Sequence, residues 1–470
     1  MNSVFSGHLG RDFARLSIPC VLNLLVFSVY TIVDGFFVSH FLGEEALAAV
    51  NLSTPLIYLL YALGIAMAVG SGVLISEALG KAGKLQGAGS RQLENGRRVE
   101  ESSSCEESGN KATEADAIFS ESFLFTALLG ILFSFLTLIF RKPVCSLLGR
   151  EASGLVWEYL GPLALFFPFV TLEYSLEFLV KINGAPRYSL FVITGTCLFN
   201  IFGDWLLMGP LQMGLRGAAI ATGFSQFLAA ALFFLKIMRN RQGSFHLNFS
   251  LLKGRKLRPF RYLFLGAADG SMELCNAVRA WLYNTLLLRI SGGDAVAAFS
   301  VLNYAGTLCF NVATGITQGM EPLVSYHSAA GHGKEVRTLL KIGSGAEAAA
   351  AVLCWGGMTF FTPAICGLFL KTGGAAYSFA LSAARRYALS FLLLGMNILI
   401  SGFLTALQEA RKALVISLLR GLLIHGLLLL LFAALLPKAF FYAAALSELL
   451  TGAISFFFLQ KKLRREEYAF

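Results

Sequence analysis

The sequence predicts an all-α, polytopic membrane protein with twelve transmembrane helices in two pseudo-symmetric six-helix bundles. Composition, the placement of basic residues and an internal repeat support this prediction. Of the 470 residues, 56% are hydrophobic and 14% are charged, whereas soluble domains carry about 25% charged residues. A water-soluble fold of this length cannot hide so much apolar surface, so soluble enzymes and nucleic-acid-binding proteins are disfavoured.

The chain length fits twelve spans. If one span needs about 20 apolar residues, twelve use roughly 240, and about as many remain for helix ends and loops. The first half contains six apolar segments, at about 16–41, 49–79, 117–140, 156–180, 189–209 and 216–235. The second half contains six more, at about 262–288, 295–327, 342–370, 387–407, 413–435 and 439–459.

The basic residues indicate the orientation of these spans. Of the 38 Lys and Arg residues, 27 lie in alternate flanks, beginning with the N-terminal one. Because cytoplasmic loops are enriched in Lys and Arg, we expect a multi-pass protein of the cytoplasmic membrane with both termini in the cytoplasm. The net charge of +10 then indicates contact with anionic membrane lipids rather than nucleic acid.

One segment differs in composition from the predicted spans around it. Residues 84–116 are rich in Ser, Gly, Glu and Arg and contain little that a core could bury. Such a composition is typical of disorder. We therefore expect a disordered cytoplasmic insertion there, and we favour a tolerated insertion over the alternative of a regulatory segment. The eight cysteines have no CxxC spacing, which predicts neither disulfides nor a structural metal site.

An internal repeat divides the chain into two halves. GEEALAAV at 43–50 returns as GGDAVAAF at 292–299, and the same offset aligns GSGVLISEALGKAG at 70–83 with GMEPLVSYHSAAGH at 319–332. We expect an N-terminal lobe over 1–240 and a C-terminal lobe over 241–470. An even number of spans in each half makes the repeats parallel, an arrangement found in transporters whose halves rock around a central site.

A few polar residues within the spans are candidates for that central chemistry, because such groups are costly in hydrocarbon and commonly functional. Asp34 lies in the first span. Asn200 and Asp204 share one helix face in the fifth, four residues apart, and Thr222 lies at a similar depth in the sixth. Together they offer oxygens for Na⁺ or a shared proton, although they can also serve as interhelical hydrogen-bonding groups. Pro19 should bend or soften the first helix.

Several motifs resemble those of the multidrug and toxic compound extrusion (MATE) transporters, which belong to the oligosaccharidyl-lipid and polysaccharide exporter (MOP) superfamily. They are IP at 18–19, VDGFFVSHFLGEEALAA at 33–49, NIFGD at 200–204, GLRGAAIATGFSQ at 214–226 and GITQGMEPLVSYH at 315–327. The resemblance covers nearly the whole chain except 84–116. It implies a V of two six-helix bundles and drug efflux driven by inward flow of H⁺ or Na⁺.

The resemblance also assigns roles to residues. Pro19, Asp34, Asn200, Asp204 and Thr222 match the N-lobe cation site of that family. Glu273, in GAADGSMELCN, is similar in position to a glutamate that the family uses, which implies a substrate contact or part of a second cation site. The family's second acidic residue in the C-lobe has no counterpart in YALSFLLLGMNILISGFL at 387–404, so Glu273 can instead pair with Arg279.

Other charged or polar residues in the spans are interpreted as structural. Glu177 and Lys181 are four residues apart and can pair on one helix face. The remaining ones are expected to serve as interhelical polar contacts; they are Glu173, Asp269, Glu321, Arg420 and His425.

These observations together predict a monomeric, cation-coupled antiporter that exports small organic cations by alternating access. The coupling ion would be H⁺ or Na⁺, without any other cofactor and without catalytic residues. A lipid-linked precursor flippase of the same superfamily is one alternative, but its pyrophosphate substrate would require a more cationic cavity. A membrane-embedded transferase is the other alternative, and it would need a catalytic motif that the sequence lacks.

Overall fold

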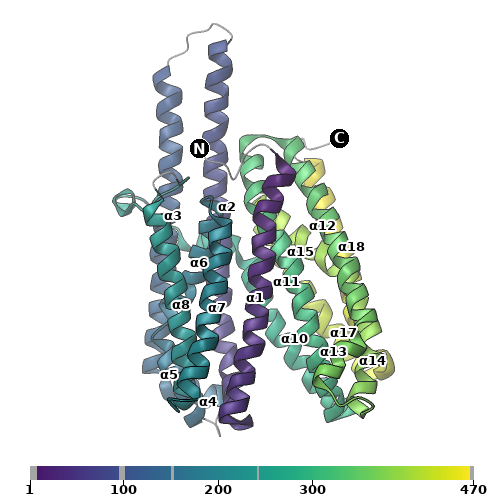
Figure 1. The fold of residues 1–470 in the computed structure, drawn as a ribbon. Coiled ribbons are helices and arrows are strands. Elements are labelled where there is room, and N and C mark those ends of the chain that lie inside the picture. Colours follow the sequence, from purple (N-terminus) through teal and green to yellow (C-terminus); the bar gives the residue numbers. More distant parts are fainter. Residues whose placement is uncertain (1–7, 95–100, 150–152, 241–242, 466–470) are drawn as a thin grey trace.

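The computed structural model describes residues 8–94, 101–149, 153–240 and 243–465, and their regular elements are all helical (Figure 1). The prediction of an all-α polytopic protein is therefore confirmed. The helices of the first half are α1 (Leu9–Leu42), α2 (Glu44–Glu94), α3 (Glu101–Ile139), α4 (Arg141–Gly149), α5 (Ser153–Ala164), α6 (Phe167–Ile182), α7 (Pro186–Met208) and α8 (Gly214–Arg239).

The second half continues with shorter and more interrupted helices. They are η1 (Phe249–Leu252), α9 (Pro259–Leu265), α10 (Ala267–Ser291), α11 (Gly293–Ala330), α12 (Gly333–Phe360), α13 (Thr362–Phe369), α14 (Ala375–Ala388), α15 (Phe391–Ala406), α16 (Ala410–Leu418), η2 (Leu419–Leu423), α17 (Ile424–Leu435), η3 (Pro437–Ala439) and α18 (Tyr442–Arg465). The η2 segment is a π-helix that joins α16 and α17 into one apolar stretch.

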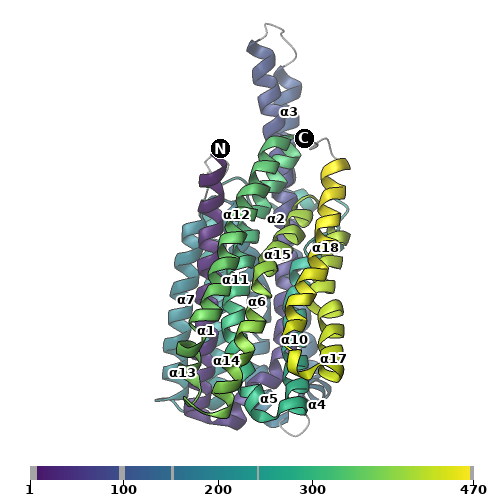
Figure 2. The ribbon, with the colours of Figure 1, turned by 90° about the vertical axis from the view of Figure 1, so that its right-hand side faces the viewer.

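Length and apolarity identify fewer crossings than the twelve predicted. Within the described residues, eight helices are long and apolar enough to cross a membrane, or ten crossings if two bent pairs each count as one. The bent pairs are α5–α6 and α14–α15, with bends of 56° and 46°. Helices α10 and α12 run through the bundle beside the others (Figure 2). Both carry several charged residues, which lower their mean hydropathy, and this explains why they are not among the helices counted as apolar enough to cross a membrane.

The outer surface of the bundle is apolar. Large hydrophobic side chains on several helices are widely exposed, for example Phe191 on α7 and Leu353 on α12, each at 75%. In water such a surface would favour aggregation, whereas lipid tails solvate it. The surface therefore supports placement of the helices in a bilayer.

Two glycines give the internal repeat the same turn in both halves. Gly43 separates α1 from α2 with φ 88°, and Gly292 separates α10 from α11 with φ 78°. Backbone at positive φ favours glycine because it has no Cβ. The repeated sequences at 43–50 and 292–299 thus start from equivalent backbone turns, which supports the assignment of the two segments as a repeat.

The two halves contact each other through α1, α2, α10 and α11. Ser17 Oγ donates to the carbonyl oxygen of Ile316 over 3.3 Å, and Ser325 Oγ donates to that of Val73 over 2.7 Å. These residues lie near the start of α1 and in the C-terminal halves of α2 and α11. Both chain termini are at this end of the bundle (Figure 1), which we call the terminal end.

Glycines allow the backbones of the two halves to approach at the terminal end. A Cβ on Gly70 of α2 would overlap the carbonyl group of Tyr262 in α9, and one on Gly319 of α11 would overlap Ser17 of α1. A hydrophobic cluster that joins Phe13 and Leu16 to residues of α10, α11 and α15 packs nearby. The terminal end is therefore closed by tight packing between the halves.

The expected disordered insertion is wrong for the parts of 84–116 that are described. Helix α2 continues to Glu94 and α3 begins at Glu101, so that the pair projects beyond the terminal end (Figure 1). Extending a helix that has already formed adds one hydrogen bond per residue without a new nucleation cost. This continuation overrides the polar composition from which we inferred disorder. Residues 95–100 of the segment lie outside the described residues.

Candidate functional site

The structure brings Asp34, Asn200, Asp204 and Thr222 together from three helices of the first half. Asn200 and Asp204 lie one turn apart on α7, and Asn200 Nδ2 donates to Thr222 Oγ1 of α8 over 3.4 Å. The carboxyl groups of Asp34, on α1, and Asp204 lie within hydrogen-bonding reach of each other. The prediction that these four residues form one cluster is consistent with this arrangement.

Burial makes this cluster unusual. Asp204 is fully buried, Asn200 is 1% exposed and Thr222 is 5% exposed. Four buried oxygens have no hydrogen-bond partner in the structure: Asp34 Oδ1, Asn200 Oδ1 and both carboxyl oxygens of Asp204. Buried polar atoms in native proteins are nearly always paired, because an unpaired one is costly. A shared proton or a bound cation would satisfy these oxygens.

The chemical type of these oxygens limits what they can bind. Two carboxyls, one amide and one hydroxyl are hard ligands, which suit cations such as Na⁺ rather than soft transition metals. Across the described ranges, no group of three or more His, Cys, Asp or Glu side chains is placed to hold a metal ion.

Pro19 lies away from the oxygen cluster. It is buried inside α1, which continues as one 34-residue helix through it. Fifteen residues separate it from Asp34, which corresponds to about 22 Å along a helix. Its neighbour Ser17 contacts α11 at the terminal end. The structure thus places Pro19 at the contact between the halves rather than among the ion ligands.

A central cavity of about 1120 Å³ lies between the two halves. Helices α1, α2, α6, α10 and α11 contribute most of its wall, and aromatic residues such as Tyr58, Tyr174 and Phe310 line it. A volume of this order, with mainly apolar walls and a few polar groups, is typical of sites for drug-sized ligands. Most of the residues of α2 and α11 that line the cavity precede Gly70 and Gly319 in the sequence, the glycines at which the two halves pack together at the terminal end.

Glu273 is part of the cavity wall, together with Glu173 and Glu177. Arg279 and Glu273 are near enough to interact electrostatically, but no direct ion pair joins them, and Arg279 donates to Asn276 Oδ1 over 2.8 Å. Glu273 therefore remains a carboxyl group facing the cavity, where it is placed to contact a substrate.

Glu177 and Lys181 form the ion pair that their spacing predicts, with 2.5 Å between Lys181 Nζ and Glu177 Oε1. Asn23 and Ser189 also donate to Glu177 Oε1. This network links α1, α6 and α7 at the edge of the cavity. The Glu177 carboxylate is satisfied by three donors within the protein, so we assign it a structural role.

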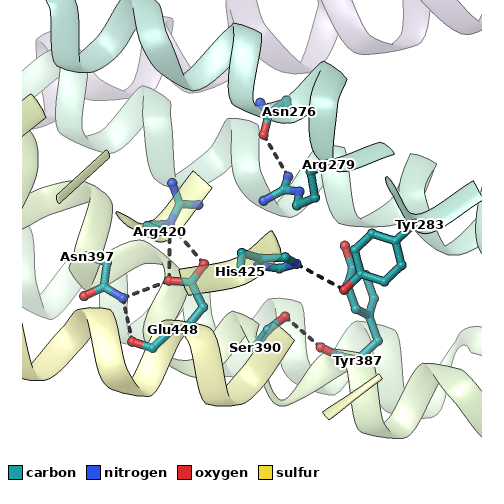
Figure 3. A network of polar contacts seen from close by, with 9 residues as sticks. All are labelled: Asn276, Arg279, Tyr283, Tyr387, Ser390, Asn397, Arg420, His425 and Glu448. Carbon is teal, nitrogen blue, oxygen red and sulfur yellow. Dashed lines mark hydrogen bonds and ion pairs between the residues drawn. The ribbon is translucent and has the colours of Figure 1, made fainter. Parts of the chain in front are cut away.

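A second polar network holds the helices of the C-terminal half together (Figure 3). Arg420 Nε donates to both carboxyl oxygens of Glu448, over 3.0 and 3.2 Å, and Asn397 Nδ2 donates to Glu448 Oε2 over 2.8 Å. His425 Nε2 lies 3.3 Å from the hydroxyl of Tyr283. The interpretation of Arg420 and His425 as interhelical polar contacts is therefore confirmed.

Asp269 and Glu321 form a pair that sequence reasoning missed. They interact across α10 and α11, both are buried, and Asp269 Oδ2 and both carboxyl oxygens of Glu321 have no hydrogen-bond partner. The sequence places them 52 residues apart in different spans, so only the packing of α10 on α11 brings them together.

Comparisons with known proteins agree with this architecture. The family model described as MatE matches residues 19–91 and 272–431. Multidrug export protein MepA of Staphylococcus aureus is 24% identical over 416 residues, which cover 88% of this chain and 85% of that protein. MepA of Staphylococcus saprophyticus is 23% identical over 427 residues, covering 90% and 86%.

Solved structures share the fold at low sequence identity. One is described as the outward-facing conformation of a multidrug resistance MATE family transporter of the MOP superfamily. It matches this chain with a TM-score of 0.84 at 18% sequence identity, and the match covers 98% of this chain and 97% of that one. A MOP superfamily transporter from Pyrococcus furiosus, with a binding pocket described as having reverse polarity, also reaches 0.84 at 17% identity, covering 97% and 96%.

The family model matches segments in both halves, and the relatives and solved structures extend over nearly the whole chain. The resemblance inferred from the sequence motifs and the helical architecture described above agree with them. On these grounds the chain belongs to the MATE family of transmembrane transporters.

Proposed function

We propose that this MATE transporter is an H⁺- or Na⁺-coupled antiporter that exports small organic cations by alternating access. The single observation that carries the proposal is the cluster of four buried, unpartnered oxygens around Asp34 and Asp204. Two carboxyls in mutual contact repel each other when both are ionised, and a proton or a Na⁺ ion between them relieves that repulsion. The cluster therefore supports reversible binding of a coupling cation.

The central cavity supports the substrate side of the proposal. Its aromatic wall suits flat organic molecules, and the carboxyls of Glu173 and Glu273 favour a positive charge on them. Asp34 and Asp204 are not among the residues that line it. Ion and substrate would thus occupy different sites and affect each other through the arrangement of α1, which contributes to both.

The closed terminal end supports an alternating-access cycle. In the proposed cycle, this arrangement binds the ion at Asp34 and Asp204, α1 repacks, and the substrate leaves the cavity on the side away from the termini. The halves, 1–240 and 241–470, then rock to expose the cavity at the terminal end. The ion and the substrate must prefer different arrangements, since a ligand that binds both equally shifts neither.

The proposed orientation follows from the basic residues. With both termini in the cytoplasm of a multi-pass protein in the plasma membrane, the closed terminal end would face the cytoplasm. The basic loops would contact anionic lipid headgroups. One chain contains both the cavity and the oxygen cluster, so we propose that the protein works as a monomer.

Transport by the purified protein in liposomes tests the proposal. Uptake of a fluorescent organic cation is measured while a pH gradient and a Na⁺ gradient are imposed separately. Accumulation driven by either gradient, and its collapse when an ionophore dissipates that gradient, is the expected result. Equal uptake with and without both gradients would contradict ion coupling.

A further inference from the structure

The chain segment that connects the two halves forms part of a second cavity, of about 320 Å³, at the terminal end. The segment runs from the end of α8 to the start of α10, and α2 and α3 complete the cavity wall. None of its described lining residues belongs to the central cavity or to the oxygen cluster. Four of them are basic, and all four come from the connecting segment: Arg255, Lys256, Arg258 and Arg261.

The acids of this second cavity do not neutralise its basic residues. Four basic and two acidic side chains give the wall a net charge of +2. Glu121 of α3 is 1% exposed, and it accepts from the backbone nitrogen of Arg258 and, over 2.7 Å, from the hydroxyl of Tyr262. Arg255 Nε lies 3.8 Å from the same carboxylate. The other acid, Glu114, is exposed, so water screens its charge.

Three basic side chains of the wall remain available to a ligand. In the described part of the chain, no ion pair holds Lys256, Arg258 or Arg261, and all three are exposed. An anion that enters the cavity can therefore accept from them without breaking an ion pair of the folded protein. Guanidinium groups bind phosphate through two parallel hydrogen bonds, so a phosphate group suits these donors.

The connecting segment also exposes aromatic side chains beside these basic ones. Phe260 and Phe264 lie one turn apart on α9, and they are 81% and 46% exposed. The apolar span of α3 begins at Glu114, which lines the cavity, so the cavity lies where that span meets the aqueous phase. Aromatic and basic residues together are typical of segments at the membrane interface. A ligand of this site would thus combine an anionic group with an apolar body.

We propose that this second cavity binds the phosphate group of an anionic phospholipid. Lys256, Arg258 and Arg261 hold the phosphate, while Phe260 and Phe264 contact the acyl chains outside the cavity. The volume fits a headgroup, since cavities of about 300–1,000 Å³ hold small ligands. Basic pockets between membrane-spanning helices bind anionic headgroups. Such a site is more specific than the general attraction between basic loops and anionic lipid, and it depends neither on ion coupling nor on the exported substrate.

Lipid titrations followed by native mass spectrometry test the site, because this method counts bound lipids directly. The full-length protein in detergent is titrated with phosphatidylglycerol and, separately, with phosphatidylcholine, whose headgroup contains a phosphate but has no net charge. We expect the first phosphatidylglycerol to bind wild type about tenfold more tightly than the first phosphatidylcholine. Glycerol 3-phosphate, which carries the anionic group without acyl chains, is the third ligand and should bind more weakly than phosphatidylglycerol.

Two double variants separate the phosphate contact from the acyl contact. Arg258→Gln with Arg261→Gln should weaken phosphatidylglycerol binding about tenfold and leave phosphatidylcholine binding within about twofold. Both arginine side chains are exposed, so their replacement should not disturb folding. Phe260→Ser with Phe264→Ser should weaken phosphatidylglycerol binding about threefold or more, because apolar contact with the acyl chains is lost, and leave glycerol 3-phosphate binding unchanged.

Lys334→Gln with Lys341→Gln is the charge-matched control, since it removes two exposed charges from α12, and it should leave all three affinities unchanged. Equal affinity of wild type for phosphatidylglycerol and phosphatidylcholine would overturn the inference. So would a loss in this control equal to that in the arginine variant, because it would show a general effect of surface charge. Glycerol 3-phosphate binding as tight as that of phosphatidylglycerol would identify a site for soluble phosphates and overturn the lipid assignment.

Discussion

At the scale of single residues, Thr222 controls how Asn200 is presented to the carboxyl pair. Its hydroxyl accepts from Asn200 Nδ2, which leaves Asn200 Oδ1 without a partner and available as a ligand. Asp204, one turn further along α7, offers two more oxygens. The hydroxyl therefore orients the amide as well as being a candidate ligand itself.

Thr222→Val tests this role because it keeps the side-chain shape and removes the hydroxyl. The amide nitrogen of Asn200 would lose its acceptor, at a cost of about 1–3 kcal/mol. We expect the ion concentration for half-maximal transport to rise about threefold to tenfold, with dye binding unchanged. Thr222→Ser should restore the wild-type value. Unchanged ion dependence in Thr222→Val would show that the hydroxyl takes no part in coupling.

Residues of the candidate ion cluster were predictable from sequence, while the cavity wall was not. Asn200 and Asp204 share a helix face through their spacing alone, and motifs add Asp34 and Thr222. The pairing of Asp269 with Glu321 and the position of Glu273 in the cavity wall depend on helix packing. No spacing along the chain encodes those contacts, because they join spans that are distant in sequence.

At the scale of helices, the contact of α2 with α9 determines how tightly the terminal end closes. Gly70→Ala introduces a Cβ where the Tyr262 carbonyl lies, and such overpacking costs about 1–3 kcal/mol. The substitution should shift the population toward an arrangement opened at the terminal end. Gly356→Ala in α12 is the matched control, since no atom lies within 4 Å of its Cβ position.

Spin labels measure this shift. Cysteines replacing the exposed residues Arg239 and Lys334 place one label on α8 and one on α12, near the terminal end. In Gly70→Ala we expect a larger share of long interlabel distances than in wild type or Gly356→Ala. The same distance distribution in all three proteins would mean that Gly70 does not limit closure.

The projecting parts of α2 and α3 illustrate where composition misleads. Their polar sequence indicates disorder, yet each extends a helix rooted in the bundle. We expect removal of residues 87–110, closed by a short Gly-Ser turn, to leave the initial transport rate within about twofold, because loop length costs little in stability. Liposome transport checks this. A loss of transport at normal protein yield would assign the projection a functional role.

At the scale of the whole molecule, the account requires two arrangements of the halves that differ in their affinity for ion and substrate. Moving such an equilibrium from one side almost fully to the other needs a differential affinity of about 10⁴-fold. The oxygen cluster can supply such a difference. Its buried oxygens are unpaired when no cation is bound, and this costs free energy that a bound cation would recover. Helix α1 connects the cluster to the contact with α11.

The most direct test of ion coupling compares gradient-driven transport by wild type, Asp34→Asn and Asp204→Asn in liposomes. Asp294→Asn, at an exposed position at the start of α11, is the control. We predict that both cluster variants still bind dye within about threefold of wild type but lose accumulation against a gradient, while Asp294→Asn behaves as wild type. Wild-type accumulation by Asp34→Asn and Asp204→Asn would contradict the account.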